Sequence, residues 1–175
     1  MKEEQRPNVL EASRESFVSQ WGTIGNAWGI NRTMAQIHAL LMTAPQPLST
    51  DEIMEDLKIS RGNANTNLRD LVGWGLIRPV LRKGERREYF EAEKDVWKMF
   101  CIIARERKRR EILPAMEVLR SCAAQTKGLK DPRSKEFHDQ MQSLLEFLRL
   151  GEKVLETVAS AEQNKILKMA ARFLT

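Results

Sequence analysis

The side chains of this sequence that are best suited to hydrogen bonding with a partner lie in the run SRGNANTNLRD, from Ser60 to Asp70. This run contains three asparagines, Asn63, Asn65 and Asn67, although asparagine is a mediocre helix former. A carboxamide donates and accepts hydrogen bonds at once, which suits the edge of a nucleic-acid base. A solvated polar helix with no partner is the alternative interpretation of the same run.

Cationic side chains are concentrated immediately after the asparagines. Between Ser60 and Phe90 seven basic residues stand against three acidic ones, and four of the seven surround Gly84. A basic tip of this kind gains counterion-release free energy on a phosphate backbone. The seven basic residues are Arg61, Arg69, Arg78, Arg82, Lys83, Arg86 and Arg87.

A short helix is predicted to carry the asparagines. Ser60 is a suitable N-cap, and Gly73 and Gly75 are expected to end the helix. Gly62 has no side chain, so the first turn can lie close to a partner. The apolar residues recur with the spacing of one helical face, and they are Ala64, Leu68, Leu71 and Val72. The opposite face consists of Gly62, Asn63, Thr66, Arg69 and Asp70.

Two further patterns complete a winged helix-turn-helix arrangement. Ser49 and Glu52 form a capping box for a preceding short helix, which a tight turn joins to the asparagine-rich helix. Residues 76–81 and 87–90 are predicted as the strands of a hairpin that turns at Gly84-Glu85. In this arrangement a polar helix enters a groove of a nucleic-acid duplex and a basic hairpin reaches the flanking backbone.

The composition is typical of a soluble, helix-rich chain of one domain or two closely joined ones. The 175 residues are 42% hydrophobic and carry a formal net charge of +5, which favours an anionic partner. The N-terminal MKEEQRPNVLEASRE is too polar for a signal peptide, and no run approaches the roughly 18 apolar residues of a membrane helix. We therefore expect a cytoplasmic, nucleoid-associated protein without a membrane partner. Cys101 and Cys122 are expected to be reduced core thiols.

Helical patterns flank this central part on both sides. Residues 8–28 form a predicted helix whose apolar stripe includes Phe17 and Trp21, and residues 31–43 form a second helix. Residues 94–125 are predicted as a long helix that Pro114 kinks or breaks near Arg110. The run RERKRRE from 105 to 111 is either a solvated face beside that break, a second phosphate contact, or a cationic lining between two regions.

The C-terminal region has the spacing of a helix–helix interface. From residue 137 to residue 158 the apolar positions alternate steps of four and three, which is a heptad seam. This seam predicts a dimer, with packing inside one chain as the alternative. The expected interface residues are Phe17, Trp21, Phe137, Met141, Leu144, Leu148, Leu155, Ile166 and Phe173.

These elements predict a fold that is mainly α with a small β-hairpin wing. Residues 1–30 would contribute a helix to dimerisation, residues 31–92 would form the winged helix-turn-helix domain, and residues 93–175 would form a helical dimerisation region. Two reading helices related by a two-fold axis recognise a pseudo-palindromic duplex. A small-molecule effector between the DNA-binding lobe and the dimer helices could change their separation. Trp28, Trp97 and Phe100 are either its aromatic surface or core residues.

The run from Trp21 to Glu91 resembles the MarR superfamily of transcriptional regulators, and in particular its GbsR-type branch. The matching segments are PLSTDEIMEDLKISRGNANTNLRDLVGWGLIRPV and KGERREYFEAE. The resemblance implies a homodimer that binds double-stranded operator DNA, usually as a repressor. Together with the residue pattern, it predicts DNA contacts from Ser60, Arg61, Gly62, Asn63, Asn65, Thr66, Arg69, Arg82, Lys83, Arg86 and Arg87.

Other classes of function have less support in the residues. His38 and His138 are the only histidines, and neither has a partner at metal-ligand or catalytic-triad spacing, so neither an enzyme nor a cofactor is expected. A winged-helix scaffold for protein interactions is the main alternative, and it would tolerate loss of the basic wing. An RNA duplex is a poor fit, because its major groove is too narrow for a helix.

Overall fold

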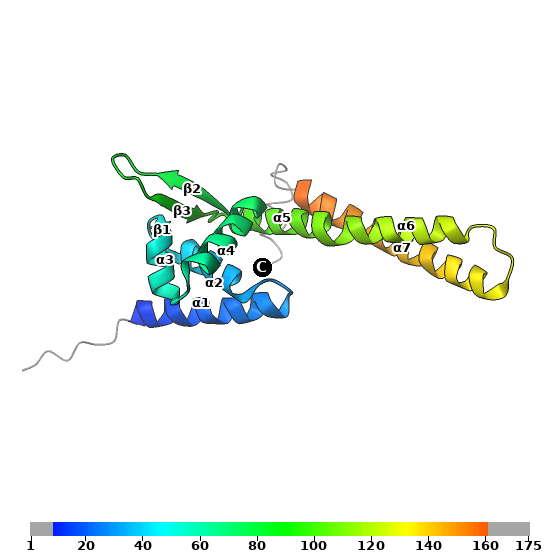
Figure 1. Cartoon of the computed structure of the whole chain (residues 1–175), viewed down its shortest axis with the longest axis horizontal. Helices are drawn as coiled ribbons and strands as arrows, with labels where there is room; N and C mark the ends of the chain where they lie inside the picture. Colours follow the sequence, from blue (N-terminus) through cyan, green and yellow to red (C-terminus); the bar gives the residue numbers. More distant parts are fainter. Residues whose placement is uncertain (1–8, 161–175) are drawn as a thin grey trace, which may run out of the picture. The chain divides into compact units, whose positions relative to one another are not determined.

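A computed structural model of the chain describes residues 9–160, which are mainly helical with a small antiparallel sheet. The chain divides into two compact units, residues 1–95 and residues 96–175, and Figure 1 shows the elements of each. The predicted fold class, mainly α with a small wing, is confirmed.

The first unit contains four helices and three strands among its described residues. The predicted helices form within one or two residues of the expected bounds, and three of the four begin at a side-chain N-cap, Asn31, Ser49 or Ser60. The elements are α1 (Val9–Ala27), α2 (Arg32–Thr43), β1 (Leu48–Ser49), α3 (Thr50–Leu57), α4 (Arg61–Trp74), β2 (Ile77–Leu81) and β3 (Glu88–Ala92).

Helix α2 is the centre of this unit, because it contacts α1, α3, α4 and β3. Its N-cap Asn31 accepts from the Met34 N–H at 3.1 Å, as the sequence predicted. The apolar faces of α2, α3 and α4 meet in a fully enclosed core, and burial of this apolar surface is the main stabilising contribution. That core includes Ile37, Leu41, Ile53, Leu68 and Leu71.

Glycines on α1 explain how it packs on α2. A Cβ at Gly22 would lie 2.5 Å from Gln36 Cγ, and one at Gly25 would lie 2.6 Å from Ala35 Cβ. At Gly22 the flexible side chain of Gln36 would have to shift, whereas the Ala35 Cβ opposite Gly25 is fixed to the backbone, so the close approach of the two helices requires glycine at position 25. From the sequence these glycines only weaken the helix, whereas in the fold they form its packing face.

The sheet differs from the predicted two-stranded hairpin. It has three antiparallel strands in the order β1-β3-β2, with Leu48 opposite Phe90 and Val80 opposite Tyr89. Strand β1 has only two residues, which is too short for any periodic signal in the sequence. Figure 1 shows the β2–β3 hairpin projecting beyond the helices of its unit.

The second unit consists of helices only, among the residues described. They are α5 (Val96–Arg107), the π-helix η1 (Lys108–Ile112), α6 (Leu113–Thr126) and α7 (Pro132–Ser160). The predicted break near Arg110 is present as the π-helix, because Pro114 has no N–H to continue the α-helical hydrogen bonds. Helix α7 contacts α5, η1 and α6, and Met116, Ala123 and Leu145 are buried there.

The heptad positions of α7 do not share one environment. Met141, Leu148 and Leu155 are half-buried, whereas Phe137 and Leu144 are exposed. Among residues 132–157 of this helix the most buried is Leu145, which is not part of the predicted seam. The centre of the packed face is therefore rotated from the prediction. Ile166 and Phe173 lie outside the described residues.

Within residues 9–160, no helix is long and apolar enough to cross a membrane. Cys101 is buried and Cys122 is half-buried, and neither forms a disulfide within the described residues.

Candidate nucleic-acid interface

A helix-turn-helix is formed by α3 and α4. Ser49 and Glu52 form the predicted capping box: the Ser49 N–H donates to Glu52 Oε2 at 2.7 Å, and Ser49 Oγ accepts from the Glu52 N–H at 3.3 Å. The Ser49 hydroxyl also donates to Glu52 Oε2 at 2.7 Å, and this hydrogen bond, followed by that of the Ser49 N–H, lowers the pKa of Glu52. Lys58 adopts a left-handed conformation (φ 53°) and ends α3. Ser60 then caps α4 by accepting from the Asn63 N–H.

The predicted outer face of α4 is exposed. Ser60, Arg61, Gly62, Asn63, Asn65, Thr66 and Arg69 are all accessible to a partner. No described atom lies within 4 Å of the Cβ position of Gly62, so packing within the chain does not require glycine there. Two expectations for this helix are wrong: Gly73 lies inside α4, which ends at Gly75 (φ 79°), and Val72 is exposed.

Asn67 is the asparagine that the predicted interface omits. It lies on the inner side of α4, is 4% exposed, and donates to the side-chain oxygen of Asn63 at 2.7 Å. The spacing of four residues between Asn63 and Asn67 is the sequence signal for this contact.

The turn of the wing presents cations. Lys83, Arg86 and Arg87 are exposed, and Gly84 occupies the turn with φ 88°. For Lys83 and Arg86 there is no hydrogen bond or ion pair within the part of the chain that the structure describes. Their charge is therefore available to an anion.

Arg82 has a different environment from the other predicted wing contacts. Its guanidinium lies 4.0 Å from the centre of the Tyr89 ring and donates to the Pro47 carbonyl at 3.0 Å. Tyr89 in turn donates to Glu85, and this hydrogen bond raises the pKa of Tyr89. These contacts join the wing to the start of β1, so Arg82 has a structural role whether or not it also contacts DNA.

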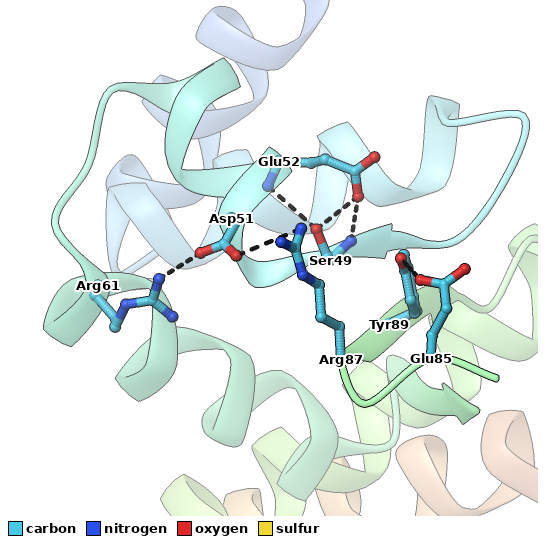
Figure 2. A network of polar contacts seen from close by, with 7 residues as sticks. All are labelled: Ser49, Asp51, Glu52, Arg61, Glu85, Arg87 and Tyr89. Atoms are coloured by element: carbon cyan, nitrogen blue, oxygen red, sulfur yellow. Dashed lines mark hydrogen bonds and ion pairs between the residues drawn. The ribbon is translucent and has the colours of Figure 1, made fainter. Parts of the chain in front are cut away.

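Asp51 links the two predicted DNA-contacting elements, and the sequence alone did not single it out. Figure 2 shows its carboxylate between Arg61 of α4 and Arg87 of the wing. It forms a short ion pair with Arg61, and Arg87 Nη1 lies 3.8 Å from its second oxygen. The arginines come from segments far apart in the chain, so no local pattern reveals the contact.

The basic run from 105 to 111 lies on α5 and η1, and its cations are largely paired within the second unit. Arg107 contacts Glu111, Arg109 and Arg110 contact Glu106, and Lys108 contacts Glu152 and Glu156. Hydrogen bonding to Arg109 lowers the pKa of Glu106, as does the contact with Arg110. Intramolecular pairing accounts for these charges without an anionic partner. No group of residues suited to metal binding is found in the described ranges.

A helix-turn-helix followed by a β-hairpin with a basic loop, in a sheet completed by a short strand before the first helix of the motif, defines the winged helix-turn-helix class of transcriptional regulators. Comparison with known proteins gives the same class. The chain is 19% identical over 173 residues to the HTH-type transcriptional repressor GbsR of Bacillus subtilis, covering 94% of this chain and 96% of that protein. It is 25% identical over 143 residues to the HTH-type transcriptional regulator MmpR5 of Mycobacterium tuberculosis, covering 81% of each.

A solved structure described as that of a transcriptional regulator has the same fold. It superposes with a TM-score of 0.69 at 22% identity, covering 87% of this chain and 99% of that chain. No family model matches the sequence. These relatives are regulators and not enzymes, in agreement with the absence of catalytic spacing in the sequence.

Proposed function

We propose that the protein is a homodimeric transcriptional regulator that binds a pseudo-palindromic operator in double-stranded DNA and acts as a repressor in the cytoplasm, at the nucleoid. The observation that carries this proposal is the exposed face of α4 beside the unpaired cations of the wing. Helix α4 would enter the major groove with Asn63, Asn65 and Thr66. Arg61, Arg69, Lys83, Arg86 and Arg87 would contact the flanking backbone.

Two exposed apolar stripes support the homodimer. Leu10 and Ile24 of α1 and Trp28 just after it are exposed, and the centres of the half-buried rings of Phe17 and Trp21 lie 5.4 Å apart along the same stripe. On α7, the exposed apolar side chains fall within a sector of about 140° at 100° per residue. They are Phe137, Leu144, Phe147, Leu150 and Val154. Contiguous apolar surface of this kind marks protein interaction sites.

A small-molecule effector is the third part of the proposal. A groove of about 260 Å³ lies between α1, α2 and α3 and is lined by residues that include Arg14, Gln36 and Leu57. The Nη2 atom of Arg14 is buried there and has no hydrogen-bond partner in the described part of the chain. A buried donor without a partner favours a ligand with an acceptor oxygen. This groove joins the α1 stripe to the helix-turn-helix, so a ligand there could alter both.

The decisive experiment is duplex binding by a wing variant over a range of salt concentrations. Arg86→Ala combined with Arg87→Ala should weaken binding to all duplexes and reduce the slope of log K against log[salt] by about two units. Arg120→Ala with Arg133→Ala is the matched control, because it removes the same charge from the second unit. A protein-interaction scaffold without DNA binding would instead show no retention of any duplex at low salt.

A further inference from the structure

The side chains of Asn63 and Asn67 lie one turn apart on α4 and are hydrogen-bonded to each other. Asn67 is buried and Asn63 is exposed. The Nδ2 atom of Asn67 donates to the Asn63 backbone carbonyl at 2.8 Å and to Asn63 Oδ1 at 2.7 Å. A buried side chain therefore holds an exposed one that lies on the candidate reading face.

The orientation of both carboxamides follows from these two hydrogen bonds. A backbone carbonyl only accepts, so the Asn67 atom facing it must be the NH₂ group. The second hydrogen of that group points to the Asn63 side chain, which must present its oxygen in return. One lone pair of the Asn63 oxygen is then engaged by Asn67, which turns that oxygen toward the helix and leaves the NH₂ group as the outward part of the carboxamide.

We propose that Asn67 is a positioning residue that turns the carboxamide of Asn63 so that it offers its NH₂ group outward, and that α4 thereby selects a keto base, guanine or thymine, at the position that Asn63 contacts. In the major groove guanine offers O6 and N7 and thymine offers O4 as acceptors, whereas cytosine offers a donor. Adenine pairs an acceptor with a donor, and its bidentate recognition by asparagine needs a free carboxamide oxygen. Asn67 holds that oxygen toward the helix and away from the edge of such a base.

Asn65 provides a comparison on the same helix. It is exposed, and its side chain has no hydrogen bond within the region that the structure describes. Its carboxamide keeps both functions, so Asn65 retains the ordinary preference for adenine where it meets a base. The two asparagines thus differ in specificity although they are two residues apart and chemically identical.

The proposal rests on the proposed function, and selection of bound sequences from a random duplex library tests both separately. The wild-type protein should prefer a keto base by about fivefold or more at one position, and Asn63→Ala should lose that preference alone. Asn67→Leu keeps the buried volume, removes the donor and should admit adenine at the same position. Asn65→Ala should change a different position and leave this one intact.

Each outcome has a fixed meaning. Failure of the wild-type protein to select any duplex refutes the proposed function itself. A preference for adenine at the Asn63-dependent position, or no base preference that depends on Asn63, overturns the role given to Asn67. An unchanged keto preference in a folded Asn67→Leu protein, with folding checked by thermal melting, also overturns it, since a purely structural residue would alter stability and not base choice.

A second measurement keeps the test sound if Asn67→Leu does not fold. The selected operator is made with the keto base replaced by adenine, and binding is compared for the wild-type protein and Asn63→Ala. The wild-type protein should lose about fivefold or more in affinity, and Asn63→Ala should lose little. Equal losses for both proteins would overturn the proposal.

Discussion

The first unit should lose stability in mild acid through one buried histidine. His38 lies on α2, is 4% exposed, and its Nε2 atom has no hydrogen-bond partner among the described residues. Burial lowers the pKa of His38 to about 4, from 6.5 in an unfolded chain, because the charged ring loses its hydration. The folded protein therefore holds the neutral ring, and protons bind preferentially to the unfolded chain.

The sign and size of the effect follow from this difference in pKa. The stability that depends on a neutral His38 ring is fully present above the unfolded pKa of 6.5. It is lost as the pH falls toward the folded pKa of about 4. By proton linkage, the free energy of unfolding should decrease by about 2 kcal/mol between pH 7 and pH 5. A decrease of this size is a large part of the stability of a small domain. Helix α2, which carries His38, also contacts α4 directly.

Urea unfolding of the wild-type protein and of His38→Leu at pH 7, 6 and 5 measures how much of the pH dependence of the free energy of unfolding is due to His38. His38→Leu should lack the decrease of about 2 kcal/mol, whatever its stability at pH 7. The control is His138→Gln, because that ring contacts Thr126 and the Ala123 carbonyl in the second unit. Parallel pH profiles for the wild-type protein and His38→Leu would refute the assignment.

Three further changes test packing, charge and assembly. Gly25→Ala should destabilise the protein by roughly 1–3 kcal/mol, because its Cβ would meet Ala35. Gly73→Ala, with open space around it, should stabilise the protein by about 0.5–1 kcal/mol. Thermal melts that do not separate the two variants would contradict the packing of α1. Asp51→Asn should tighten duplex binding about three- to tenfold at low salt, because Arg61 and Arg87 would no longer be paired. Glu55→Gln on the same helix is the charge control for Asp51, and equal gains in gel shift would remove any special role for the ion pairs. Phe147→Asp with Val154→Asp, both exposed on α7, should yield monomers in light scattering, and a persistent dimer would place the interface elsewhere.

Several features were predictable because their signals are local. Ser49 with Glu52, Asn31 and Ser60 each cap a helix through atoms no more than three residues away. The outer face of α4 follows from the helical period alone, and the interruption near Arg110 follows from the missing N–H of Pro114, although its form as a π-helix was not predicted. The sequence by itself thus determined the order of the helices and of the β2–β3 hairpin, the exposure of Asn63 and Asn65, and the basic composition of the wing.

The tertiary structure decided which of these side chains are available. Arg82 binds the Pro47 carbonyl 35 residues away in sequence, and Asp51 reaches the wing only because β1 pairs with β3. The outward face of α7 depends on how that helix packs against α5 and α6. The close approach of α1 to α2 depends on Gly22 lying opposite Gln36 and Gly25 lying opposite Ala35. Local periodicity determines which side chains lie on the same face of a helix or strand. Contacts between residues distant in sequence form only when the chain folds into its tertiary structure.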